Sequence, residues 1–137
     1  MKTPISSMMQ RSVWTASMDD SIEVVERLVA EKGLSWVPVQ DPGGAIVGVI
    51  SASDLLQFHA TRRDAKQVCA WELCTYKPVT VTPDADASSV ASMMATHGIH
   101  HVVVMEGGLL QGVVSSLDFV RRFAAEGAAA PDQEGGN

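Results

Sequence analysis

Apolar side chains recur along two stretches of the chain with the spacing of one helical face. They stand at Ile22, Val25, Leu28 and Val29 in the first stretch and at Ala87, Val90, Met93 and Met94 in the second. Steps of three and four residues place such side chains on one side of an α-helix, so each stretch predicts a helix. Asp19, Asp20 and Asp84 suit the N-caps, because a carboxylate accepts free backbone N–H groups there. Gly33 and Gly98 suit the C-caps.

Strand patterns surround both predicted helices. A short β-branched segment precedes each helix, at residues 13–15 and 79–81. Two apolar segments follow each helix and flank a glycine-bearing turn, which predicts a hairpin. A further helix then opens at Ser51 in the first half and at Ser115 in the second. Each half therefore predicts the element order β-α-β-β-α.

The two halves are copies of one unit, because a shift of 65 residues aligns the sequence with itself. The aligned pairs are residues 17–19 with 82–84, 31–34 with 96–99, and 37–39 with 102–104. Beyond a turn that is one residue shorter in the second half, a shift of 64 aligns residues 48–54 with 112–118. True repeats tolerate such a deletion in a turn.

A unit of about fifty residues is marginal alone, so we expect the two units to pack sheet against sheet. The predicted fold class is α/β in its α+β form, with two tandem β-α-β-β-α repeats, pseudo-twofold symmetry and a cleft between the repeats. Residues 1–68 are the first repeat, whose last helix extends through residues 58–70 as a linker helix, and residues 69–123 are the second repeat. The small and polar residues 124–137 predict a disordered tail.

Composition narrows the classes of function. The chain has 137 residues, 46% of them hydrophobic, so it can bury a core. A net charge of −6 argues against nucleic acid as a partner, because a nucleic-acid backbone requires a broad basic surface. The two cysteines lack zinc-type spacing and fit a reducing compartment. Because no secretory signal or membrane-length apolar run is found, we expect a cytoplasmic protein with no membrane partner.

A serine and an aspartate open the last helix of each repeat at the same spacing. They are Ser51 with Asp54 and Ser115 with Asp118. This spacing is typical of a capping box, in which the serine accepts one backbone N–H and the acid accepts another. A helix N-terminus also attracts anions, so the same residues are candidates for a ligand site.

Both halves resemble the cystathionine-β-synthase-type (CBS) repeat. The match lies in an apolar strand and turn followed by GVISASDLL in the first half and GVVSSLDFV in the second, with GIHHVVV as a further match. It covers residues 4–123. The resemblance implies a stand-alone pair of CBS repeats that binds AMP, ADP, ATP or S-adenosylmethionine between its halves. Such a pair regulates an effector protein, as in energy sensing.

The resemblance also implies roles for the paired residues. In the family the matching aspartate accepts the two ribose hydroxyls and the matching serine lies near the phosphate, which gives these roles to Asp54 with Ser51 and to Asp118 with Ser115. The chemistry agrees, because a carboxylate can accept two hydrogen bonds from a cis-diol. Ser53 adds a second hydroxyl beside Asp54, whereas its counterpart in the second repeat is a leucine.

In this family each pocket is completed by the other repeat. The implied residues are Ile99, His100, His101 and the segment Thr75-Tyr76-Lys77 for the Asp54 pocket, and Leu34, Ser35, Trp36, Arg11, Ser12 and Met18 for the Asp118 pocket. Adenine would pack on Ile99 or on Leu34. The two histidines and Lys77 are the candidate cations for phosphate in the first pocket, and Arg11 is the candidate in the second.

The histidines have other interpretations. His97, His100 and His101 could form a metal site, but adjacent strand residues point to opposite faces, and no cysteine or acidic ligand is near. An ordinary solvated or interface role is a second alternative. In the phosphate interpretation, an imidazole with a pKa near 6.5 takes up a proton when the phosphate dianion binds.

The sequence contains no nucleophile with a neighbouring base, no paired catalytic carboxylates and no phosphate-cradling glycine loop, so we expect neither an enzyme nor a required cofactor. Three functions remain open: a sensor of adenosine-containing ligands, an assembly module with vestigial pockets that binds a partner protein, and a nucleotide hydrolase. A homodimer is expected from apolar helix faces, which contain Val24, Val25, Leu28, Met93 and Met94.

Overall fold

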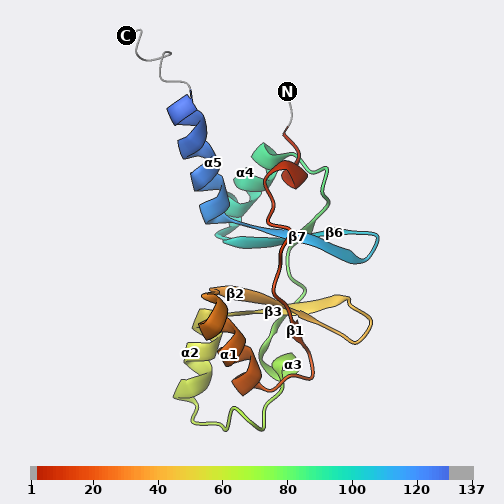
Figure 1. The fold of residues 1–137 in the computed structure, drawn as a ribbon, viewed down its shortest axis with the longest axis vertical. Coiled ribbons are helices and arrows are strands. Elements are labelled where there is room, and N and C mark those ends of the chain that lie inside the picture. Colours follow the sequence, from red (N-terminus) through yellow and green to blue (C-terminus); the bar gives the residue numbers. More distant parts are fainter. Residues whose placement is uncertain (1–2, 130–137) are drawn as a thin grey trace.

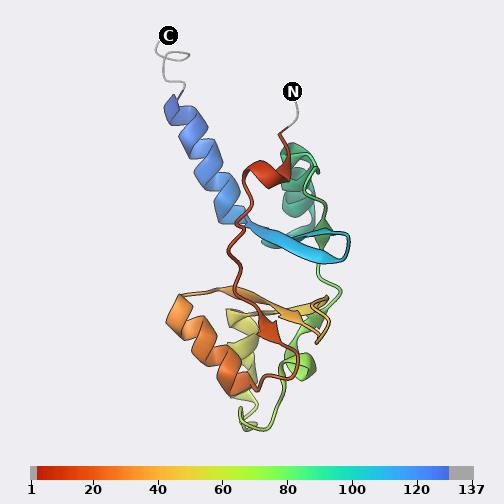
Figure 2. The same ribbon diagram turned by 45° about the vertical axis from the view of Figure 1, so that its right-hand side comes forward.

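The computed structural model describes residues 3–129 and shows two similar units, one above the other in Figure 1. In each unit the sheet faces the other unit and the helices lie on its outer side, as Figure 2 also shows from a second direction. Each sheet combines parallel and antiparallel pairs of strands. The predicted α+β fold with two tandem repeats is therefore confirmed.

The first unit contains a four-stranded sheet in the order β1-β2-β3-β4. Its elements are β1 (Ala16–Ser17), α1 (Ile22–Lys32), β2 (Trp36–Gln40), β3 (Ile46–Ser51), α2 (Ala52–Ala60), α3 (Ala70–Leu73) and β4 (Thr75–Tyr76). Strand β1 runs parallel to β2, and β3 runs antiparallel to both of its neighbours.

The second unit repeats this plan with a three-stranded sheet in the order β5-β6-β7. Its elements are the 3-10 helix η1 (Ile5–Ser7), β5 (Thr80–Val81), α4 (Ala87–His97), β6 (His101–Glu106), β7 (Leu109–Ser115) and α5 (Ser116–Ala129). The hairpins of the two units shift register at equivalent places, after Val39 and after Val104. The two units therefore share this irregularity of the hairpin backbone as well as their order of elements.

Each sheet is extended by a segment that precedes the other repeat. Gln10 exchanges two backbone hydrogen bonds, of 2.9 and 3.0 Å, with Val113 of β7. Thr75 of β4 is aligned with Val49 of β3 in the equivalent place. The extension needs a glycine in the neighbouring strand, because a Cβ on Gly48 would lie 2.5 Å from the carbonyl oxygen of Thr75. Residues 3–10 thus belong spatially to the second unit.

The helix caps differ in part from the sequence prediction. Ser21 and Asp86 are the N-caps of α1 and α4, each accepting a backbone N–H from the residue three positions later. The predicted N-cap Asp20 instead accepts the N–H of Ser17 in the preceding turn, and Asp84 accepts the hydroxyl of Thr82. With these local bonds in place, both helices begin later along the chain than the sequence predicted. The C-caps are confirmed, because Gly33 and Gly98 adopt φ values of 64° and 66°.

Three element boundaries in the structure differ from those that the sequence predicted. Strand β1 starts at Ala16, after the predicted residues 13–15, because its pairing with β2 begins there. The prediction of a linker helix over residues 58–70 is wrong, because α2 ends at Ala60. Just after this end, the Thr61 hydroxyl donates to the Phe58 carbonyl and Arg62 adopts a positive φ of 61°. Helix α5 continues through residues 124–129, which were expected to be disordered, and the rest of that tail lies outside the described residues.

Each unit has its own apolar core between its sheet and its helices. The predicted helical faces are confirmed, with Ile22 and Val25 buried in the first core and Val90 and Met94 buried in the second. Successive strand residues point to opposite faces of a sheet. Pro38 and Val103 accordingly lie outside these two cores and are fully buried on the inner faces. The two units therefore press against each other through their sheets.

Neither a membrane-spanning helix nor a metal cluster occurs between residues 3 and 129. No helix in this range is both long enough and apolar enough to cross a bilayer. No group of three or more His, Cys, Asp or Glu side chains in the same range could hold a metal ion. His97, His100 and His101 do not form such a group.

Candidate functional site

Asp54 stands in the first turn of α2, directly after the inner strand β3. Its carboxylate oxygen Oδ2 accepts the N–H of Ser51 at 2.8 Å, and its own N–H donates to the Ser51 hydroxyl at 3.1 Å. The predicted capping box is therefore present. The second carboxylate oxygen, Oδ1, accepts no hydrogen bond from the described residues. The start of α2 therefore presents one carboxylate oxygen, Oδ1 of Asp54, that can accept a hydrogen bond from a ligand.

Asp118 occupies the equivalent position in α5. Its Oδ2 accepts the N–H of Ser115 at 2.8 Å, and its N–H donates to the Ser115 hydroxyl at 3.2 Å. Here, however, the second oxygen is engaged as well, because the Gln10 side-chain amide donates to Oδ1 at 2.9 Å. Sequence reasoning missed Gln10, since it lies 108 residues away along the chain and belongs to no recognisable motif.

Trp36 and His101 meet between the two units. They are the first residues of β2 and β6, and their rings stack with centroids 4.7 Å apart and planes 6° apart. Burial lowers the pKa of the His101 imidazole below its ordinary value, the neighbouring His100 lowers the pKa further, and the Asp118 carboxylate raises it in part. The prediction of an unperturbed pKa is therefore wrong for this histidine. The assignment of His101 to the Asp54 pocket stays a prediction.

Ile99 and His100 are held by their own unit. Ile99 packs against the second core, and its N–H donates to the Met94 carbonyl at 2.9 Å as part of the C-cap. The carbonyl of His100 accepts the N–H of Ser116 at 2.9 Å. In the first unit Leu34 and Ser35 occupy the equivalent places. In both units this loop is thus fastened to the start of the last helix, beside the capping box.

Four of the candidate side chains are exposed, those of Arg11, Ser12, Ser53 and Lys77. Arg11 donates to the Ser6 carbonyl at 3.3 Å, so its guanidinium turns back toward η1. Lys77 adopts a positive φ of 59° directly after β4. Ser12, Ser53 and Lys77 make no side-chain hydrogen bond to the described residues. Whether these side chains contact a ligand stays a prediction.

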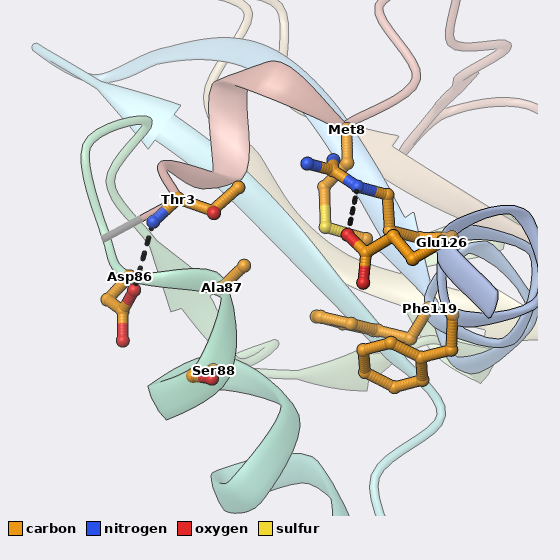
Figure 3. A pocket seen from close by; sticks show the side chains of 9 residues that line it. Thr3, Met8, Asp86, Ala87, Ser88, Phe119 and Glu126 are labelled. Carbon is orange, nitrogen blue, oxygen red and sulfur yellow. Dashed lines mark hydrogen bonds and ion pairs between the residues drawn. The ribbon is translucent and has the colours of Figure 1, made fainter. Parts of the chain in front are cut away.

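One cavity lies away from both capping boxes (Figure 3). It has a volume of about 130 Å³ and is bounded by the N-terminal segment, the start of α4 and the later turns of α5. Figure 3 shows Thr3 and Asp86 on one side of it and Phe119 and Glu126 on the other. Asp86 accepts the N–H of Thr3, and the charges of Arg122 and Glu126 compensate each other in an ion pair of 3.0 Å.

Two shallow grooves occupy equivalent places on the helices. The first lies between α1 and α2 and is bordered by Leu56, Glu26 and His59, the last two forming an ion pair. The second lies between α4 and α5 and is bordered by apolar Met94 and Phe123. Both grooves are lined mainly by apolar side chains.

A known domain family matches each of the two repeats of the chain. The model of the CBS domain matches residues 5–60 and again residues 70–125. The chain therefore belongs to the CBS domain family, with two copies of the domain in tandem. The second match begins close to α3, which precedes β4 and β5 in the structure.

Curated relatives are longer proteins. An inosine-5'-monophosphate dehydrogenase from Korarchaeum cryptofilum is 32% identical over 126 residues, which are 91% of this chain and 25% of the dehydrogenase. An uncharacterized protein from Methanocaldococcus jannaschii, MJ1404, is 27% identical over 137 residues, 89% of this chain and 32% of that protein. The chain thus spans a third or less of these relatives, and the likeness transfers no dehydrogenase activity.

Solved structures share the fold over nearly the whole chain. A putative acetoin utilization protein (AcuB) from Vibrio cholerae has a TM-score of 0.84 at 22% identity, covering 97% of this chain and 98% of that one. The CBS domain pair of MJ0100, in complex with 5-methylthioadenosine and S-adenosyl-L-methionine, has a TM-score of 0.82 at 23% identity and covers 92% and 99%. The CBS domain of a bacterial CNNM/CorC family Mg²⁺ transporter, in complex with ATP, has a TM-score of 0.78 at 26% identity and covers 86% and 84%.

Proposed function

We propose that this chain is a regulatory module, without catalytic activity, that binds an adenosine-containing ligand between its two CBS repeats. AMP, ADP, ATP and S-adenosylmethionine are the candidate ligands. The observation that carries the proposal is the pair of carboxylates, Asp54 and Asp118, each held by a capping box at the start of a helix that directly follows a strand. Ligand complexes of similar CBS pairs support it.

The capping box suits the carboxylate to a ribose. One oxygen of Asp54 is held by the N–H of Ser51, which fixes the orientation of the carboxylate, and the other can accept a ribose hydroxyl. The free N–H groups of the helix start favour a nearby phosphate. Ser51, Ser53 and Lys77 would complete this pocket on its polar side.

His101 would serve phosphate only after it gains a proton. Its lowered pKa makes the free imidazole largely neutral at pH 7, because burial disfavours the charged form. A bound phosphate dianion would raise the pKa again. Binding of a phosphate dianion beside His101 would therefore be accompanied by proton uptake.

A second candidate function is assembly without a ligand. The capping boxes account for both serine and aspartate pairs locally, and the helices carry exposed apolar side chains at Leu56, Val120 and Phe123. We propose that these helices form a homodimer in either case, because burying the exposed side chains removes apolar surface from water. Ligand binding then distinguishes a sensor from an assembly module.

The test is thermal unfolding with each candidate ligand at millimolar concentration. A ligand that binds only the folded state adds about 2.7 kcal/mol at a hundredfold excess over Kd, which raises the melting temperature by several degrees. The control is 2'-deoxyAMP, which lacks one ribose hydroxyl and should give a smaller shift than AMP. If none of the four ligands shifts the melting temperature, the sensor proposal is wrong. Loss of nucleotide over time would instead indicate a hydrolase.

A further inference from the structure

The two carboxylates differ in how many of their oxygens are already bonded. Both Asp54 and Asp118 accept a backbone N–H through Oδ2 at 2.8 Å. Only Asp118 also accepts a side-chain amide through Oδ1, from Gln10 at 2.9 Å. The oxygen that is open in the first repeat is thus occupied in the second.

The difference has its origin in one pair of equivalent residues. Gln10 pairs with Val113 as Thr75 pairs with Val49, so Gln10 and Thr75 extend the two sheets at the same position. The backbone of Gln10 is fixed by its two hydrogen bonds to Val113, which places its long side chain beside Asp118. Thr75 has a shorter side chain, and it makes no hydrogen bond to Asp54.

We infer that Gln10 occupies the ligand-binding oxygen of Asp118, so that an adenosine-containing ligand binds at the Asp54 pocket first and enters the Asp118 pocket only by displacing the Gln10 amide. The inference rests on the proposed function and concerns which of its two pockets is filled. The Gln10 amide donates to the carboxylate as a ribose hydroxyl would. It therefore competes with the ligand for the same acceptor.

The strength of one hydrogen bond sets how much the Gln10 amide can weaken ligand binding at the Asp118 pocket. A hydrogen bond to a charged group is worth enough to change an equilibrium by roughly tenfold or more. The Gln10 side chain is exposed and its backbone is held independently, so it can swing away without disturbing the sheet. We expect an AMP affinity at the Asp118 pocket that is roughly tenfold below the affinity at the Asp54 pocket.

The test is calorimetric titration of the wild-type chain and of Gln10→Ala, with AMP and S-adenosylmethionine as separate probes. The wild type should bind one equivalent tightly and a second weakly. Gln10→Ala should bind the second equivalent roughly tenfold more tightly and leave the first unchanged. Gln67→Ala is the matched control, because it removes an exposed glutamine amide from the segment between α2 and α3, and it should leave both affinities unchanged.

A double variant identifies the pocket. Gln10→Ala combined with Asp54→Asn should retain one tight site, and Gln10→Ala combined with Asp118→Asn should behave like the wild type without its weak site. Two equal sites in the wild type, or tight binding that survives Asp54→Asn but not Asp118→Asn, would overturn the inequivalence. If neither the wild type nor Gln10→Ala binds either probe, the proposed function itself fails, and the inequivalence fails with it.

Discussion

Trp36 and His101 occupy equivalent positions in the two repeats and stack on each other across the interface between them, with ring centroids 4.7 Å apart. Aromatic pairs contribute about 0.5–1.5 kcal/mol beyond the area they bury. The stack lies between the sheets that carry the two capping boxes, and His101 is within electrostatic reach of Asp118. A ligand that binds between the repeats, as proposed, would therefore meet a contact to which both repeats contribute one ring.

We predict that the melting temperature falls as the pH is lowered from 7 to 5, and that His101→Phe weakens this dependence. The folded-state pKa of His101 is lowered mainly by burial, so the unfolded chain binds more protons in this range. The stability is fully present above the unfolded pKa of about 6.5 and is lost as the pH falls through the folded pKa. Phenylalanine preserves a ring against Trp36 but cannot take up a proton.

His97→Gln is the control for this pH series, because His97 is exposed at the end of α4. It should retain the wild-type dependence of melting temperature on pH. An identical dependence in wild type and His101→Phe would show that His101 is not responsible.

The second prediction separates capping from ligand binding at Asp54. Asp54→Ala should lower the stability by about 1 kcal/mol, because the N–H of Ser51 loses its acceptor. Asp54→Asn keeps an acceptor for that N–H and should melt close to wild type, yet its neutral amide should bind AMP at least tenfold more weakly. Thermal unfolding and calorimetry measure the two effects. Normal AMP affinity in folded Asp54→Asn would leave the aspartate with a capping role alone.

The third prediction concerns the close approach of the added strand. Gly48→Ala should destabilise the fold by about 1–3 kcal/mol, the usual cost of overpacking. The reason is that its Cβ would lie 2.5 Å from the Thr75 carbonyl oxygen and 2.7 Å from the Cys74 sulfur. Gly43→Ala is the control, since its Cβ would have no neighbour closer than 3.4 Å, and it should change stability by no more than about 0.5 kcal/mol. Equal denaturation midpoints for the two variants would contradict the steric argument.

The fourth prediction tests the helices as the homodimer surface. Phe123, on α5, is 58% exposed and borders the groove between α4 and α5. Phe123→Asp should therefore shift the mass measured by light scattering from twice the chain mass of 14.6 kDa toward that mass itself. Leu109→Asp is the matched control, because Leu109 is 63% exposed but lies on the hairpin of β7, away from the helices. A monomeric wild type, or dissociation by both variants alike, would count against this surface.

The sequence by itself determined the repeated unit, its helices and its capping boxes. These features depend on contacts within a few residues, such as the bond from Asp54 N–H to Ser51 or the left-handed C-cap at Gly33, so local spacing is sufficient to predict them. Local rules failed where a nearby polar group competed, as at Asp20, whose carboxylate closes a turn instead of capping α1.

Only the tertiary structure decided how the two copies differ. The edge strands are added from outside each repeat, so the position of Gln10 beside Asp118 depends on a backbone pairing with Val113 that no local pattern encodes. The stack of His101 on Trp36 likewise requires two sheets to meet, and the burial that lowers the pKa of His101 exists only in the packed molecule. Contacts between distant residues depend on the packing of whole elements, and that packing made two similar sequences into two unequal candidate sites.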